Sequence, residues 1–126
     1  MKYKVLKKQN SSKTCLVCGV KNDLGLKARF YQLENGELVS IFNSKEFHQS
    51  YPGRVHGGIS AAILDETIGR AISVSDETVW GVTGSLELRY KKPVPIDCDL
   101  ITVARVTRDT RKLFEGEGEI ILPNGE

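Results

Sequence analysis

The sequence predicts an α+β domain in which one helix packs against an antiparallel sheet. A hairpin pattern comes first, one apolar helix follows it, and a run of strand patterns completes the chain. The helix pattern is apolar on nearly all sides, and a helix of that kind is normally enclosed by other structure. We therefore expect the sheet to wrap around the helix.

Two segments precede the predicted helix. Residues 1–14 are polar and basic with no sustained period, so we expect a loosely ordered N-terminal arm. Residues 26–34 and 37–43 are β-like runs on either side of Asn35-Gly36, a pair that strongly favours a tight hairpin turn. The sequence therefore predicts a β-hairpin before the helix.

The helix is predicted from Gly57 to about Ser75. Its apolar residues point nearly all round a helical wheel: Ile59, Ala61, Ala62, Ile63, Leu64, Ile68, Ala71 and Ile72. Residues 79–91 then alternate between two faces, which predicts a long strand with one side against the helix. The apolar face of that strand comprises Trp80, Val82, Leu86, Leu88 and Tyr90. Further strands are expected at residues 100–107 and 113–122.

Composition limits the classes of function. The chain has 126 residues and a formal net charge of +2, which fits one domain and gives no argument for nucleic-acid binding. No apolar run approaches the roughly 20 residues of a membrane span, so we expect no membrane partner. No apolar stretch of a secretory signal follows the basic N-terminus. With three cysteines and no export signal, we expect a reducing, cytoplasmic setting.

The start of the predicted helix carries the sequence His56-Gly57-Gly58. The first N–H groups of a helix lack intrahelical acceptors and lie at the positive end of its dipole. Glycines allow close approach to these donors, which are therefore suited to hold an oxyanion. Alternatively, the glycines only make a tight turn into the helix. His56 fits a cap or loop anchor better than a general base.

Asp65 lies in the middle of the predicted helix among small or apolar neighbours. Aspartate is a poor residue at such a position and is rarely buried without a partner. Glu66 differs, because Arg70 follows it at the spacing of a helix ion pair. Asp65 is therefore the candidate catalytic carboxylate. The alternative is that it only accepts a hydrogen bond from a neighbouring loop.

Cys15 and Cys18 have the spacing of zinc ligands, but a structural zinc needs about four ligands. Cys98 is distant, and no second pair of this kind exists, so we expect no metal and no other cofactor. Basic residues gather at 89–92 and 105–112, either as solvated strand ends or as ligands for phosphate groups. The candidates for phosphate binding are Arg89, Lys91, Arg108 and Arg111.

The helix sequence resembles the hotdog-fold thioesterase superfamily, in its phenylacetate-degradation branch. The pattern of that branch is Gly-x-x-His-Gly-Gly, six residues, then Asp, and it is matched by Gly53, His56, Gly57, Gly58 and Asp65. The resemblance covers residues 15 to 126. Further matches are Cys15-x-x-Cys18-Gly19, Asn22, Gly25-Leu26, His48-Gln49-x-x-Pro52-Gly53, Val82-Thr83 and Arg89-Tyr90-x-x-Pro93-Val94.

This resemblance implies a hotdog domain over residues 15–126, with a curved antiparallel sheet wrapped around one long buried helix. It also implies a homodimer, often a dimer of dimers, with an acyl-CoA substrate at the subunit interface. The family has a final strand after the turn at residues 123–125, whereas the sequence given ends at Glu126. In many relatives Asn or Gly stands where this chain has Ser50.

The resemblance also implies roles for individual residues in hydrolysis of the thioester. Asp65 would act as nucleophile or general base, the Gly57 N–H would polarise the carbonyl, and the Thr83 hydroxyl would assist. His56 is counted with these catalytic candidates, and Gly58 and the four basic candidates would contact the substrate. Gly57 and Asp65 are about 12 Å apart along one helix, so we expect each site to be built from two subunits.

Two other interpretations remain on the same fold. One is a non-catalytic module that binds or senses acyl-CoA, although a sensor has no need of an unpaired carboxylate in a buried helix. The other is a hotdog dehydratase, which places its histidine and glutamate differently. A fold alone does not separate these classes.

Overall fold

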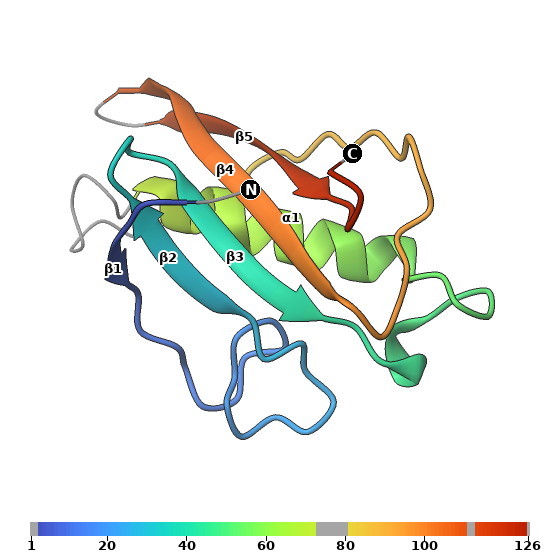
Figure 1. Cartoon of the computed structure of the whole chain (residues 1–126). Coiled ribbons are helices and arrows are strands. Elements are labelled where there is room, and N and C mark those ends of the chain that lie inside the picture. Colours follow the sequence, from blue (N-terminus) through green and yellow to red (C-terminus); the bar gives the residue numbers. More distant parts are fainter. Residues whose placement is uncertain (1–2, 73–80, 111–112, 126) are drawn as a thin grey trace.

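The computed structural model describes residues 3–72, 81–110 and 113–125, and it shows one curved antiparallel sheet that packs on one long helix (Figure 1). The strand order is β1-β2-β3-β4-β5, and α1 lies between β3 and β4 in the sequence. This arrangement confirms the predicted fold class. The bounds are β1 Val5–Lys8, β2 Arg29–Leu33, β3 Leu38–Asn43, a 3₁₀ turn Glu46–His48, α1 Gly57–Ala71, β4 Asp99–Asp109 and β5 Phe114–Ile121.

The predicted hairpin is confirmed. Strands β2 and β3 pair antiparallel around Asn35-Gly36, and Gly36 has a φ of +90°, a value that side chains other than hydrogen rarely permit. The Asn35 side chain accepts a hydrogen bond from the Glu37 N–H at 2.9 Å. The local sequence alone therefore determines this turn.

The second half of the sheet is also where the sequence places it. Strand β4 pairs with β3 through Ser40 and Thr102, and with β5 through Ala104 and Gly118. Helix α1 contacts β3, β4 and β5. Strand β5 lies close to the helix because Gly116 has no side chain: a Cβ there would be 2.8 Å from a methyl carbon of Ile68.

Helix α1 starts at the predicted residue, but it is buried on one face only. Ser60, Ile63, Thr67 and Ala71 face the sheet, and the Ser40 and Thr67 hydroxyls lie 3.1 Å apart in the core. The remaining apolar positions of the helix are half-buried or, at Gly69, exposed. The expectation of burial all round is therefore wrong for this single chain, because its sheet covers one side of the helix.

The helix ends earlier than the sequence suggested. We expected it to continue to about Ser75, whereas α1 ends at Ala71, with Ile72 as its C-cap. Positions 73–80, which include the first residues of the expected strand 79–91, lie outside the described residues. Neither helix of the described part combines the length and apolar character that crossing a membrane requires.

Part of the N-terminal arm is more ordered than expected. Val5–Lys8 form strand β1, which pairs antiparallel with β2, although all four side chains are exposed. The sequence lacks a period here because the strand contributes backbone hydrogen bonds and buries no side chain. Gln9 then reaches the end of α1, where its amide donates to the Arg70 carbonyl at 3.4 Å.

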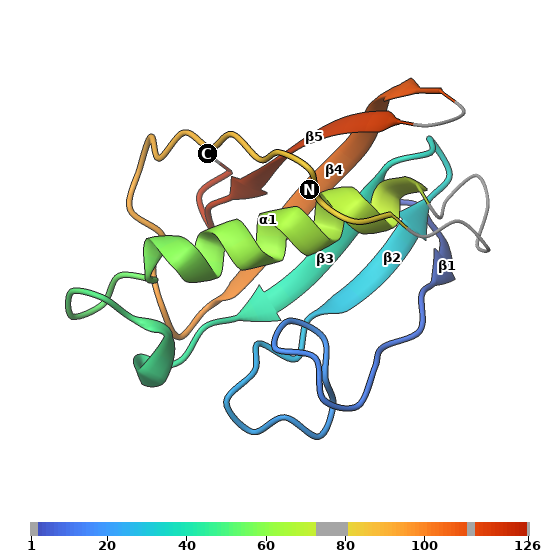
Figure 2. The same cartoon turned by 180° about the vertical axis from the view of Figure 1, so that it is seen from behind.

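The strand expected at residues 79–91 is absent from its described part, residues 81–91. This segment crosses the outer face of α1 and then passes to the N-terminal end of the helix (Figure 2). Its alternating apolar side chains do not pack as predicted, since Val82 is 98% exposed and Tyr90 is 61% exposed. A strand needs a neighbour for its backbone hydrogen bonds, and no described strand pairs with this segment.

Candidate active site

Asp65 lies on the face of α1 that points away from the sheet, and it is half-buried. The Thr83 hydroxyl, on the segment that crosses the helix, donates a hydrogen bond to Asp65 Oδ1 at 2.6 Å. The structure thus brings together the two residues that the family pattern paired. It also shows the kind of contact that the alternative interpretation required, a hydrogen bond to Asp65 from a neighbouring segment.

Asp65 and Glu66 have different surroundings. Glu66 forms the predicted ion pair with Arg70, at 3.5 Å between Oε1 and Nε. Among the described residues no cation lies within ion-pair distance of Asp65, and its one hydrogen-bond donor is neutral. Within the described part of the chain, Asp65 therefore lacks the cationic partner that Glu66 has in Arg70.

His56 caps the helix, as the sequence indicated. Its Nδ1 accepts a hydrogen bond from the Gly58 N–H at 2.8 Å, so that donor is already satisfied and is not available to a substrate. The Gly57 N–H, at the first helical position, has no acceptor among the residues that the structure describes. Gly57 is therefore the better candidate for an oxyanion donor.

A buried histidine holds this cap in place. His48 is 3% exposed and accepts a hydrogen bond from the Lys45 N–H through Nδ1 at 2.9 Å. Its Nε2 therefore carries the proton and donates to the Leu24 carbonyl at 2.7 Å. The His56 N–H in turn donates to the His48 carbonyl at 2.8 Å. From the sequence, His48 was visible only as part of the match to the family pattern, because the carbonyl that fixes it, that of Leu24, is 24 positions away.

Tyr90 was also missed as a residue of this region. Its hydroxyl donates to the Gly57 carbonyl at 2.8 Å, and its ring lies 3.4 to 3.5 Å from where a Cβ on Gly57 would be. The alternating pattern assigned Tyr90 to an apolar strand face. No local pattern signalled this contact, because Gly57 is 33 positions away in the sequence.

One chain does not bring Gly57 and Asp65 to the same point. They belong to one straight helix, and eight residues separate them in the sequence. At about 1.5 Å per residue this is about 12 Å along the axis, whereas an oxyanion donor and an attacking group must both lie about 3 Å from one reacting carbonyl. The two candidate groups of one subunit therefore cannot serve one substrate.

The basic candidates separate into different regions. Arg89 and Lys91 are exposed on either side of Tyr90, so they lie near the start of α1. Arg108 is exposed near the end of β4, which Figure 1 places toward the other end of the helix. Arg111 lies outside the described residues. Their neighbour Arg105 is a structural residue, since it pairs with Glu37, Glu117 and Glu119.

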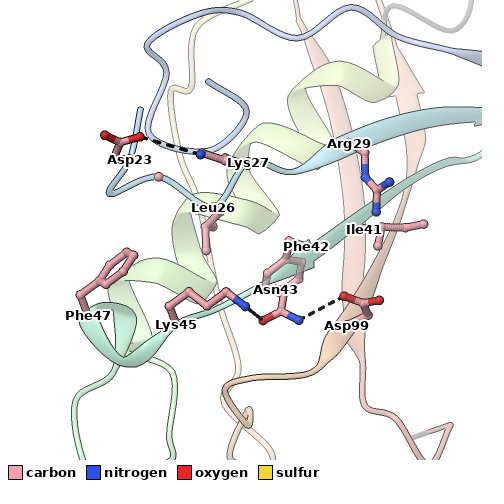
Figure 3. A pocket seen from close by; sticks show the side chains of 11 residues that line it. Asp23, Leu26, Lys27, Arg29, Ile41, Phe42, Asn43, Lys45, Phe47 and Asp99 are labelled. Atoms are coloured by element: carbon pink, nitrogen blue, oxygen red, sulfur yellow. Dashed lines mark hydrogen bonds and ion pairs between the residues drawn. The ribbon is translucent and has the colours of Figure 1, made fainter. Parts of the chain in front are cut away.

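One pocket of the described part lies elsewhere. It has a volume of about 330 Å³ and lies between the ends of β2 and β3 and the loops around them (Figure 3). Its charged residues are largely paired: Lys27 with Asp23 at 3.9 Å, and Asn43 with both Lys45 and Asp99. None of the candidate catalytic residues lines it, so we do not assign the reaction to this pocket.

The structure adds one residue to the cysteine pair that the sequence analysis set aside. Cys15, Cys18 and Glu66 place their sulfur and carboxylate oxygen atoms within 4.8 Å of one another. Burial is the main cause that raises the pKa of the Cys15 thiol above its ordinary value. Among the described residues this is the group of side chains that could hold a metal ion.

Comparison with known proteins places these features in a family. A family model described as the thioesterase superfamily matches residues 52–126, which include Gly57, Asp65 and Thr83. The mouse protein acyl-coenzyme A thioesterase THEM4 is 34% identical over 88 residues, which are 69% of this chain and 37% of that protein. The chain thus spans little more than a third of the length of this relative.

Two further similarities concern the fold and the compartment. A solved thioesterase superfamily protein is 27% identical and superposes with a TM-score of 0.81 over 89% of this chain and 54% of its own. A Candida albicans protein, described as uncharacterized and mitochondrial, is 30% identical over 97 residues, 75% of this chain and 44% of its own. The cytoplasmic setting expected from the sequence therefore stays a prediction.

Proposed function

The chain belongs to the thioesterase superfamily, and from that membership we propose that it hydrolyses an acyl-CoA thioester to a free acid and coenzyme A. The observation that carries the proposal is the state of Asp65: a half-buried carboxylate, oriented by the Thr83 hydroxyl at 2.6 Å, without a cation among its described neighbours. An aspartate in the middle of a helix lowers the stability of that helix. A catalytic role would account for its presence at this position.

Asp65 acts on the thioester in one of two ways. As a general base it removes a proton from water while the water oxygen bonds to the carbonyl carbon. As a nucleophile it bonds to that carbon itself and forms an anhydride, which water then opens. In both routes the carbon–sulfur bond breaks, and the thiolate of coenzyme A leaves with the bonding electrons and takes up a proton. Thr83 occupies Oδ1, which leaves Oδ2 for the attack.

The Gly57 N–H stabilises the oxyanion that forms on the carbonyl. It lies at the positive end of α1, and the cap formed by His56 leaves it unoccupied while using the Gly58 N–H. Because about 12 Å along the axis separates Gly57 from Asp65, the donor and the attacking carboxylate come from different subunits of a two-fold homodimer, either alone or within a dimer of dimers. The half-buried apolar residues on the outer face of α1 support such an interface.

Arg89 and Lys91 are the favoured ligands for the phosphates of coenzyme A. Both are exposed and have no ion-pair partner among the described residues, and Tyr90 between them is anchored to Gly57. Arg89 and Lys91 therefore lie near the proposed oxyanion donor, and they would contact the coenzyme A part of the substrate and not the reacting carbonyl. The compartment, cytoplasmic as expected from the sequence, belongs to this proposal as well.

A panel of acyl-CoA substrates, assayed by the release of free thiol, tests the activity. Asp65→Asn should lower kcat/KM by about 10²–10⁴-fold, the usual contribution of a general base. The matched control is Asp23→Asn, because Asp23 is an exposed aspartate whose one described contact is a 3.9 Å ion pair, and it should retain the wild-type rate.

Two results would contradict the proposal. An Asp65→Asn enzyme that hydrolyses as fast as the control would show that Asp65 is not the attacking group. A wild-type protein that binds acyl-CoA in a calorimetric titration and releases no thiol from any substrate would instead identify a binding or sensing module.

A further inference from the structure

An N-terminal loop and helix α1 meet at a cluster of two thiols and one carboxylate. Cys15 Sγ lies 3.5 Å and 3.7 Å from the two carboxylate oxygens of Glu66. Cys18 Sγ lies 3.7 Å from Glu66 Oε1. Cys15 is half-buried and Cys18 is buried. This cluster is separate from the proposed hydrolytic groups and has no task in that reaction.

We propose that Cys15, Cys18 and Glu66 bind one Zn²⁺ ion that ties the N-terminal loop to helix α1. The distances fit such a centre. Zinc–sulfur bonds of about 2.3 Å and zinc–oxygen bonds of about 2.0–2.2 Å at a tetrahedral angle place sulfur and oxygen about 3.5 Å apart. The observed sulfur–oxygen separations of 3.5 to 3.7 Å match that spacing, and all the ligand atoms lie within 4.8 Å of one another.

The loop around the two cysteines has the backbone of a metal-binding turn. The Val17 N–H donates to Cys15 Sγ at 3.4 Å, and the Gly19 N–H donates to the Cys15 carbonyl at 2.8 Å. A Cβ on Gly19 would lie 2.5 Å from that carbonyl oxygen, so the turn requires glycine. The turn thereby holds the Cys15 sulfur next to Glu66, with one backbone N–H donor, that of Val17, pointing at it.

Arg70 balances the charge of the proposed centre. Its Nη2 donates to Cys18 Sγ at 3.1 Å, while its Nε pairs with Glu66 at 3.5 Å. Two thiolates and one carboxylate carry three negative charges, which Zn²⁺ and the guanidinium neutralise. Arg70 is fixed by the Phe30 ring, 4.0 Å away, and donates to the Asn10 carbonyl at 2.8 Å. Groups that orient metal ligands in this way raise metal affinity.

Three protein ligands leave the fourth position of a tetrahedral zinc for a water molecule. Cys15 is partly exposed, which gives solvent access to the cluster, and the Ser12 hydroxyl lies beside it, 3.6 Å from Cys18 Sγ. From the sequence alone a metal was not expected, because only two ligands lie close together along the chain. Glu66, which is 51 positions from Cys15 in the sequence, supplies the third.

Titration of the reduced, metal-free chain with Co²⁺ tests the proposal, because cobalt reports its own ligands. Wild type should bind about one ion per chain, with thiolate-to-cobalt charge-transfer absorption and the visible bands of a tetrahedral site, and Zn²⁺ should abolish both. Zinc should also raise the melting temperature of the wild type. Cys98→Ser is the matched control, since Cys98 is the third free cysteine and lies outside the cluster.

Single substitutions separate the ligands. Cys15→Ser and Cys18→Ser should lose the charge-transfer absorption and the stabilisation by zinc, and Cys98→Ser should keep both. Glu66→Gln should keep the sulfur absorption but bind cobalt at least about tenfold more weakly. Arg70→Lys keeps a positive charge and should still bind.

Several outcomes would overturn the zinc site. One is a reduced wild-type chain that shows no cobalt absorption, and another is equal cobalt affinity in Cys15→Ser and wild type. A third is a Cys15–Cys18 disulfide that forms in air in a chain whose reduced form takes up no metal, because the pair would then be a redox pair. Thiol release from acyl-CoA is not part of this test, so the site and the hydrolysis stand or fall separately.

Discussion

Subunit mixing tests whether the proposed site is shared between two chains. One partner is Asp65→Asn, which lacks the attacking carboxylate. The other is Gly57→Pro, which lacks the N–H donor. Proline is tolerated at the first helical position, and the preceding His56 already has the extended backbone that a following proline requires, with φ −60° and ψ 136°. This substitution therefore removes the donor with little change in the fold.

Each variant alone should be nearly inactive. Loss of one oxyanion donor typically costs about 10²–10³-fold in kcat, and loss of the general base about 10²–10⁴-fold. After the two chains are unfolded together and refolded in equal amounts, about half of the dimers are mixed. In a mixed dimer one site combines Asp65 of one chain with the Gly57 N–H of the other and is intact, so activity should recover to about a quarter of wild type.

The assay is the initial rate of thiol release, with size-exclusion chromatography to confirm that dimers form. Gly57→Ala is the control, because it keeps the N–H and its Cβ would lie in ordinary contact with the Tyr90 ring at 3.4 Å. Its rate should lie well above that of Gly57→Pro, because only the proline variant lacks the N–H donor. If the mixture recovers no activity while dimers form, both groups act within one chain and the shared site must be abandoned.

Three further predictions concern packing, charge and substrate binding. Gly116→Ala should lower the melting temperature, because its Cβ would be 2.8 Å from a side-chain methyl of the helix and overpacking costs about 1–3 kcal/mol. Gly69 has open space where a Cβ would lie. Gly69→Ala should therefore raise the free energy of unfolding by about 0.5–1 kcal/mol. A hydrogen bond from an arginine is the main cause that lowers the pKa of Glu37. The ionised Glu37 therefore stabilises the folded chain at pH values above the ordinary glutamate pKa, and this contribution is lost as the pH falls through the lowered pKa of the folded state. Arg89→Ala with Lys91→Ala should raise KM and leave kcat nearly unchanged.

Each of these predictions has a control or a contrary outcome. Equal melting temperatures for the two glycine variants would show that the helix has room to move away from β5. For the carboxylate, Glu37→Gln should melt below wild type at pH 7, and the difference in melting temperature should narrow as the pH falls below the ordinary glutamate pKa. A difference that is constant with pH would exclude linkage to its titration. For substrate binding, Arg108→Ala at the far end of the sheet is the control. A larger effect on KM there would move the phosphate site to that end.

Local patterns predicted most of the fold and the main candidate residue. The Asn35-Gly36 turn is determined by backbone conformations of its own residues, so no tertiary information was needed. The helix start at Gly57 and the discordant carboxylate at Asp65 are also visible locally, since one depends on capping chemistry and the other on the absence of a nearby cation.

Other features depend on contacts that no local pattern contains. Apolar and polar side chains alternate over residues 81–91, and this pattern alone predicted a strand. A strand also requires a neighbouring strand for its backbone hydrogen bonds, and no described strand supplies one. The approach of Glu66 to Cys15 joins positions 51 apart, and the anchoring of Tyr90 on Gly57 joins positions 33 apart. Such pairings are set by the way the sheet places the helix.

The place of α1 between β3 and β4 has a consequence for how fast the chain folds. The two strands pair side by side, yet Asn43 and Asp99, at the end of their register, are 56 positions apart. The β2–β3 and β4–β5 hairpins close through short loops and can form early, whereas joining them requires closure of the long loop that contains α1. Chains dominated by such distant pairings fold in about milliseconds to seconds. We expect docking of α1 to set this time, so that Ile63→Val, in the buried face of the helix, slows refolding more than it speeds unfolding.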